Sequence, residues 1–147
     1  MAAKEARGVA GPQAKAPASA WWMGLAAWAV PGAGHFLQGR WVRGLLISAA
    51  VGGMFVIGLA FGGHLFGLGG GGEGGGSQLL QLPPMIANLG TGVLYLLCWV
   101  GRTGFSDAAE YAKLATFEYG NTFLLVAGLL NYLAMLDAFD IAAGRKS

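Results

Sequence analysis

The sequence predicts an all-α integral membrane protein, a bundle of about four transmembrane helices. Of its 147 residues, 55% are hydrophobic and 11% are charged, and the mean hydropathy is +0.56. A soluble core of this size cannot remove so much apolar surface from water, so the lipid bilayer is the expected surrounding. The apolar residues also gather into stretches near membrane-spanning length. We therefore expect a single transmembrane domain over residues 20–147.

Charge and cysteine content exclude several other classes. Nine basic and seven acidic residues leave a net charge of +2, too small an excess for a nucleic-acid-binding surface, so no nucleic-acid partner is expected. The only cysteine, Cys98, lies in an apolar run, which predicts neither a disulfide framework nor a thiolate metal site. Neither G-x-S-x-G nor H-E-x-x-H occurs, and we expect neither an enzyme nor a cofactor.

Residues 1–19 form a basic tail of Ala, Gly and Pro, a composition that buries nothing and indicates disorder. A secretory signal peptide over residues 1–34 is the alternative, because a basic region precedes an apolar run that ends in small residues. Pro31 and two glycines interrupt that run before any clean A-x-A cleavage site. An uncleaved first helix fits this pattern better.

The first apolar segment, Trp21 to Leu37, reaches only about 25 Å as a helix, against a bilayer core of about 30 Å. Pro31 removes a helical hydrogen bond and the glycines after it loosen the backbone, so the last turn is expected to be broken. We expect this segment to span the membrane. A re-entrant hairpin, which returns to the side it came from, is the alternative.

The second segment, Gly44 to Phe66, is a stronger span of 23 residues without a formal charge. Small residues four apart are expected to let another helix approach closely, either within the chain or in a homo-oligomer. The positions expected to pack in this way are Gly52, Gly53, Gly58 and Gly62.

Residues 67–77 contain G-G-G-G-E-G-G-G, which is typical of a flexible loop. No Lys-Ser or Lys-Thr pair follows the glycines, so a phosphate-binding loop is not expected. The third span is Leu79 to Val100, with Pro83 and Pro84 near its start, where a helix tolerates proline.

The connector from Thr103 to Tyr119 and the last span follow. Asp107 and Glu110 have capping-box spacing, which predicts a short helix along the membrane interface. The fourth span is Asn121 to Ala143, and Gly144 with the two basic residues after it is a suitable helix end.

Counting membrane crossings from the turn at Arg40 divides the polar residues between two faces. If the first segment spans, the faces carry five and four basic residues; if it is re-entrant, they carry seven and two. We expect four spans in a bacterial inner membrane, with both termini in the cytoplasm. The count places Arg40, Trp41, Arg43, Trp99, Arg102 and the connector on one face and His64, Asp137, Asp140, Arg145 and Lys146 on the other.

Two polar clusters are candidate functional sites. Asp137 and Asp140 follow seventeen uncharged residues, and a charge at the bilayer centre costs about 2.5–3.5 kcal/mol. We expect them in the last turns of the helix as interfacial caps, with a proton or cation site as the alternative. The other cluster is His35 with Arg40 and Arg43, expected at an interfacial turn that faces lipid phosphates or a specific anionic ligand. This turn is also expected to dock against the acidic connector.

Two stretches resemble known families. The turn P-G-A-G-H-F-L-Q-G-R-W-V-R-G resembles a loop of the two-transmembrane-helix domain family. The closing stretch F-E-Y-G-N-T-F-L-L-V-A-G-L-L-N-Y-L-A-M-L-D-A-F-D-I-A-A-G-R-K is similar to the last helix of an uncharacterised family of small bacterial four-helix membrane proteins, a domain of unknown function. The likeness covers most of residues 21–147 apart from the glycine loop. It implies an architecture and no assigned activity.

These observations predict an accessory, scaffold or assembly component of the bacterial membrane. The alternative is a small transporter or channel component that uses Asp137 and Asp140 as its ionisable site. No inverted repeat is recognisable in the sequence, which weighs against transport.

Overall fold

A computed structural model describes residues 17–67, 78–105 and 111–146. Three predictions fall almost wholly outside these residues: the disordered tail, the flexible glycine loop, and the capping box of Asp107 and Glu110. All regular structure within the described ranges is helical, which confirms the predicted all-α class. The elements are α1 (Ala18–Ala29), α2 (Ala33–Leu37), α3 (Trp41–Ala60), α4 (Gln78–Leu89), α5 (Val93–Gly101), the 3-10 helix η1 (Tyr111–Lys113) and α6 (Phe117–Ala142).

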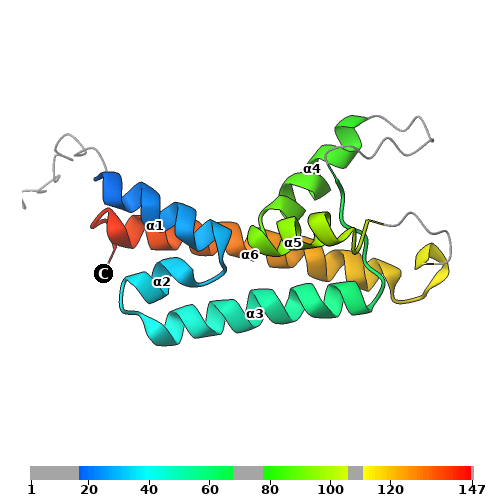
Figure 1. Ribbon diagram of the computed structural model, residues 1–147, viewed down its shortest axis with the longest axis horizontal. Coiled ribbons are helices and arrows are strands. Elements are labelled where there is room, and N and C mark those ends of the chain that lie inside the picture. Colours follow the sequence, from blue (N-terminus) through cyan, green and yellow to red (C-terminus); the bar gives the residue numbers. More distant parts are fainter. Residues whose placement is uncertain (1–16, 68–77, 106–110, 147) are drawn as a thin grey trace, which may run out of the picture.

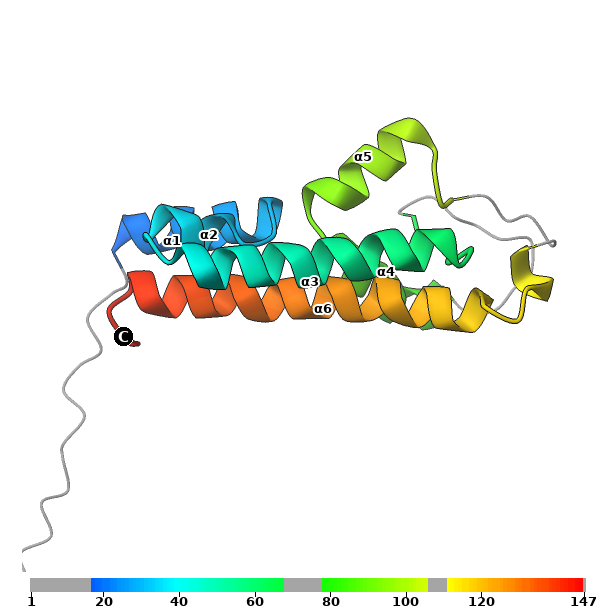
Figure 2. The same cartoon turned by 90° about the horizontal axis from the view of Figure 1, so that it is seen from below.

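Two long helices, α3 and α6, lie side by side and run in opposite directions along the molecule (Figures 1 and 2). They have 20 and 26 residues, which correspond to lengths of about 30 and 39 Å. Among the described helices these two are long and apolar enough to cross a membrane, and the bent pair α4–α5 adds a third if it is counted as one span. The predicted count of four spans is therefore not confirmed.

The predicted first span is a hairpin, made of α1 and α2. The chain turns at Gly32, whose φ of 84° lies in the left-handed region that favours glycine. At the start of α1 the ring of Trp21 packs against Phe139, with centroids 5.0 Å apart. Just after α2, Gln38 Nε2 donates to the Ala138 carbonyl at 2.8 Å. Both ends of the hairpin thus lie beside the same end of α6 (Figure 1), which is the geometry of the re-entrant alternative.

The predicted third span is also broken, and this was not foreseen. The helix axis bends by 108° between α4 and α5. Gly92, which lies between them, has a φ of 63°, a value that a regular helix cannot contain. α4 reaches the middle of α6, whereas α5 leads back toward the C-terminal end of α3 (Figures 1 and 2). There the Leu65 N–H donates to the Gly104 carbonyl at 2.7 Å, and the Tyr95 hydroxyl donates to the Phe66 carbonyl at 2.9 Å.

The order of elements in the first half of the chain recurs in the second half. Each half has a 12-residue helix, a three-residue turn, a shorter helix and then a long apolar helix. In each half the turn ends on a glycine with positive φ, Gly32 or Gly92, which caps the shorter helix. The two hairpins approach the middle of α6 from opposite ends of the α3–α6 pair (Figure 1). The chain therefore carries a repeat of elements that its sequence did not reveal.

The predictions for the two prolines, the interfacial helix and the C-terminal helix end have different outcomes. Pro83 and Pro84 lie inside α4 rather than in its first turn. In the described part of the connector the expected interfacial helix is reduced to the three residues of η1. The helix end at Gly144 is confirmed, because its φ is 72° and the Arg145 N–H donates to the Asp140 carbonyl at 2.9 Å.

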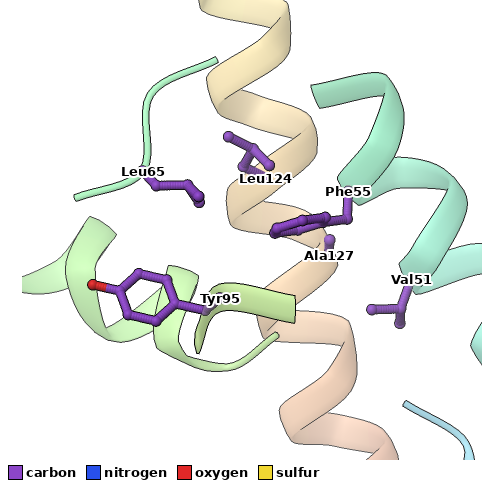
Figure 3. Packing of buried hydrophobic residues seen from close by; sticks show 6 residues of the cluster. All are labelled: Val51, Phe55, Leu65, Tyr95, Leu124 and Ala127. Carbon is purple, nitrogen blue, oxygen red and sulfur yellow. The ribbon is translucent and has the colours of Figure 1, made fainter. Parts of the chain in front are cut away.

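The hydrophobic core lies where α3, α5 and α6 meet (Figure 3). Phe55 of α3 and Leu124 of α6 are buried there together with Tyr95 of α5. Leu65, in the segment after α3, closes the cluster at the end where α5 returns. The buried cluster consists of Val51, Phe55, Leu65, Tyr95, Leu124 and Ala127.

The four glycines predicted to pack helices have different surroundings. At Gly58 an added Cβ would lie 2.7 Å from Leu124 Cγ, so this glycine does let α6 approach α3 closely. Gly62 follows the end of α3 with a φ of 80° and serves the turn instead. At Gly52 and Gly53 no described atom lies within 4 Å of an added Cβ. The tightest approach is at Gly128 of α6, where a Cβ would overlap the Ala87 carbonyl.

We expect Gly128→Ala to destabilise the fold, because the new methyl group would force α4 away from α6. Overpacking of this kind costs about 1–3 kcal/mol, and the change appears as a lower melting temperature in detergent. Gly53→Ala is the matched control: it adds the same methyl group to a helix where nothing is displaced, and helix propensity favours it by roughly 0.5–1 kcal/mol. Equal melting temperatures for the two variants would contradict the close approach of α4 and α6.

Candidate functional site

His35 and Asp137, which the crossing count had placed on opposite faces, form a hydrogen-bonded pair. His35 Nε2 lies 3.1 Å from Asp137 Oδ2, and Lys146 Nζ donates to Asp137 Oδ1 at 2.5 Å. The His35 side chain is fully buried, whereas Asp137 is 25% and Lys146 61% exposed. The three groups make a polar row that runs from the interior to one end of the bundle.

The local sequence explains why His35 reaches α6. At the preceding residue, Gly34, an added Cβ would lie 2.6 Å from Ala27 Cβ and 2.8 Å from Ala138 Cβ. Only glycine therefore lets the short helix α2 enter the space between α1 and α6. The bond from Gln38 to the Ala138 carbonyl then holds the end of α2 one turn further on.

The other predicted site residues lie at the same end but outside this row. Asp140 pairs with Arg145 at 3.3 Å, and both side chains are about half exposed. Arg40 is partly buried and Arg43 is exposed at the start of α3. Within the described ranges, no acidic side chain pairs with either arginine.

The predicted division into two faces is thus wrong. The crossing count treated residues 79–100 as one straight span, whereas the chain turns back at Gly92 and reverses the side of everything that follows. Arg40 and Trp41 therefore share an end with Asp137, and Arg102 and Trp99 lie at the other end. The expected docking of the basic turn on the acidic connector is not found at Glu118, because Arg40 and Glu118 lie at the starts of two antiparallel helices, at opposite ends. The other acids of the connector, Asp107 and Glu110, lie outside the described residues.

A second polar site, at the middle of α6, was missed. Asn131 is fully buried, and its Nδ2 donates to two carbonyls, that of Trp28 at 2.9 Å and that of Gly90 at 2.8 Å. Trp28 lies in the last turn of α1, the longer helix of the first hairpin, and Gly90 begins the turn of the second hairpin. One amide group therefore holds both hairpins to α6.

Asn88 and Thr91 complete this site. Their side chains are fully buried, and Thr91 Oγ1 donates to the backbone carbonyl of Asn88 at 2.8 Å. We call the site the hairpin junction; it consists of Asn88, Gly90, Thr91, Gly92 and Asn131, with the carbonyl of Trp28. A signal existed in the sequence, because each asparagine interrupts an apolar run and a polar group there must find a partner.

The first hairpin is also bonded to α3. Ser48 Oγ donates to the Pro31 carbonyl at 2.7 Å, which satisfies a backbone group at the break. On the opposite hairpin, the Tyr132 hydroxyl donates to the Ile86 carbonyl at 3.0 Å. Each broken helix is therefore fastened by side chains from a long helix.

The side chains at these two sites take part in hydrogen bonds. Within the described residues, no three His, Cys, Asp or Glu side chains gather closely enough to hold a metal ion. A pocket of about 340 Å³ lies at the other end of the bundle, between the end of α3 and the end of α5. His64, Arg102 and Thr103 line it, so it shares no residue with the His35 row or the junction.

The chain matches the profile of a family of unknown function (DUF6677) over residues 22–147, which include both polar sites and every helix but the start of α1. No curated protein and no solved structure matches the chain.

We expect Asn131→Leu to lower the melting temperature in detergent markedly. Leucine has nearly the same shape but leaves the carbonyls of Trp28 and Gly90 without their donor, at a cost of about 1–3 kcal/mol for each buried group. Thr122→Val is the control, because it removes a similar polar group from the exposed side of α6 and should change stability by less than about 0.5 kcal/mol. Equal effects of the two variants would contradict the role of Asn131.

The His35–Asp137 pair should be visible as an energetic coupling. We expect His35→Leu and Asp137→Leu, made singly and together, to be non-additive by about 0.5–3 kcal/mol in the free energy of unfolding, because the two groups are in contact. The same cycle with Asp140→Leu should be additive, since Asp140 bonds to Arg145 instead. Additive losses in the first cycle would show that the bond contributes nothing.

Proposed function

The chain belongs to a family of unknown function, DUF6677, and from its architecture we propose that it is an integral protein of the bacterial inner membrane with an accessory, scaffold or assembly role. α3 and α6 would cross the bilayer, while each hairpin would enter it from one side and return. Such a protein would carry no catalytic site. Its partner would be another membrane protein or a second copy of itself.

The outward surface of the long helices supports insertion in a bilayer. Large apolar side chains are exposed along both helices, far more than a soluble protein leaves in contact with water. On α6 they occupy successive turns, whereas on α3 they form one group near its start and one near its end. These side chains are Val42, Leu45, Leu46, Val56 and Ile57 on α3 and Val126, Leu129, Leu133 and Leu136 on α6.

The accessory role is supported above all by the hydrogen bonds that the buried polar groups make. Asn131 and Ser48 donate to backbone carbonyls at the helix breaks, and His35 bonds to Asp137. These groups hold the two hairpins in place and thereby stabilise one arrangement. A rigid frame of this kind suits a protein that positions partners in the membrane.

The distribution of basic residues supports an orientation. In the described part of the chain four lie at the end where α1 starts and α6 ends, and two lie at the other end. The positive-inside rule then assigns the first end to the cytoplasm, so both ends of the described domain would be cytoplasmic. The residues are Arg40, Arg43, Arg145 and Lys146 at the first end and Arg102 and Lys113 at the other.

A transport role is the second candidate, because the two hairpins end near the middle of α6 and break their helices there, a feature of many transporters. Asp137 and Asp140 would supply its ionisable groups. Both carboxylates already bond to basic side chains near the end of α6, which favours the accessory role.

The arrangement of the hairpins in a membrane can be tested by cysteine labelling. We expect Ser19→Cys and Arg43→Cys, in a Cys98→Ser background, to react with an impermeant maleimide from the same, cytoplasmic side, because the first hairpin returns before α3 begins. Thr103→Cys should react from the other side, because α5 returns to the far end of α3. Labelling of Ser19 and Arg43 from opposite sides would contradict the return of the first hairpin, and labelling of Arg43 and Thr103 from one side would contradict the return of the second.

The two candidate roles are separated by flux in proteoliposomes. We expect the purified protein to give no proton, sodium or potassium flux above that of empty liposomes, and Asp137→Asn to leave that result unchanged. A flux that the wild type shows and Asp137→Asn loses would favour the transport role over the accessory one.

A further inference from the structure

Three buried polar atoms at the hairpin junction have no hydrogen-bond partner among the described residues. They are Oδ1 and Nδ2 of Asn88 and Oδ1 of Asn131. Both side chains are 0% exposed. A buried polar group without a partner destabilises the fold, and lipid would offer no bulk water in compensation. A ligand that bonds to these atoms would remove that cost.

Asn88 lies against the stretch of α6 that carries Asn131. The backbone of Ala87 and Asn88 packs on Gly128, one turn before Asn131. The Asn131 side chain donates to the Gly90 carbonyl at 2.8 Å, and the Thr91 hydroxyl donates to the backbone carbonyl of Asn88 at 2.8 Å. Both asparagines therefore belong to one region near the middle of α6. Their open atoms belong to the junction and not to either end of the bundle.

The three atoms without a hydrogen-bond partner determine what kind of ligand can bind. Two of them are acceptors and one is a donor, so the ligand must both donate and accept hydrogen bonds. The segments 86–92 and 127–134 that form the junction contain no charged residue, so an ion would lack a counter-charge in an apolar surrounding. The ligand is therefore uncharged.

The packing of the glycines limits its size. At Gly90 an added Cβ would overlap the carbonyl of Gly128, and at Gly92 one would overlap the carbonyl of Trp28. The backbone segments are thus closer than a single methyl group permits. A ligand larger than water would have to push these segments apart.

We propose that ordered water occupies the hairpin junction, bonded to the side chain of Asn88 and to Oδ1 of Asn131. Buried water of this kind makes about three hydrogen bonds to groups that the protein leaves unsatisfied. The site lies near the middle of α6, where a membrane protein would otherwise be dry. It is separate from the His35–Asp137 row at the end of the bundle.

The test uses the wild-type chain in detergent micelles, labelled with ¹⁵N-asparagine. The chain has three asparagines, Asn88, Asn121 and Asn131, so only three side-chain NH₂ groups give signals. We record NOE and ROE spectra and expect the Asn88 NH₂ protons to show cross-peaks at the water frequency. These cross-peaks should have opposite signs in the two spectra, because the water molecule stays bound while the protein tumbles.

Two controls in the same protein bracket the result. The Asn121 side chain is partly exposed near the start of α6, so its NH₂ should detect bulk water. The backbone N–H of Ala127, added by ¹⁵N-alanine labelling, is buried one turn from Asn131 and should show no water. If Asn88 behaves like Ala127, with no water cross-peak, the junction is dry and the proposal is overturned. A cross-peak that arises only from chemical exchange with bulk solvent would overturn it too.

Discussion

The bonds from the amide of Asn131 to the carbonyls of Trp28 and Gly90 are the interaction on which the arrangement of both hairpins depends. A helix that stops in an apolar surrounding exposes carbonyls that no further turn can satisfy. Here the helices of two hairpins stop at the same level, and one NH₂ group has the two hydrogens needed to satisfy a carbonyl from each. The long helix that carries Asn131 thereby becomes the common support of both halves of the chain.

Close packing makes these bonds reachable. Gly128, one turn before Asn131, leaves room for the backbone of α4 against α6, and Gly34 does the same for α2. The glycines of the middle of α3 do not serve this purpose, since Gly52 and Gly53 have open surroundings among the described residues. Small residues four apart were therefore a poor guide to helix contacts, because spacing alone does not tell which side of a helix its neighbour occupies.

The sequence was sufficient for the all-helical class, for both long helices and for the break at Pro31. It was not sufficient for the second break. Proline and glycine together marked the first turn, whereas the turn at Gly92 contains no proline and lies in a segment long enough to span. Each crossing reverses the side of all later residues, so one unrecognised turn was enough to separate His35 from Asp137. The buried asparagines were missed for a different reason: an amide has no charge and barely alters a hydropathy profile.

The bonds that close the first hairpin join residues far apart in the chain. Asn131 follows Trp28 by 103 positions, and Asp137 follows His35 by 102. During synthesis on a ribosome the first hairpin therefore emerges long before the helix that satisfies its carbonyl, whereas the hydrogen bond from Ser48 of α3 can form earlier. Because α6 is made after the first hairpin and completes it, the nascent chain carries an unsatisfied carbonyl at Trp28 until α6 has packed against α1.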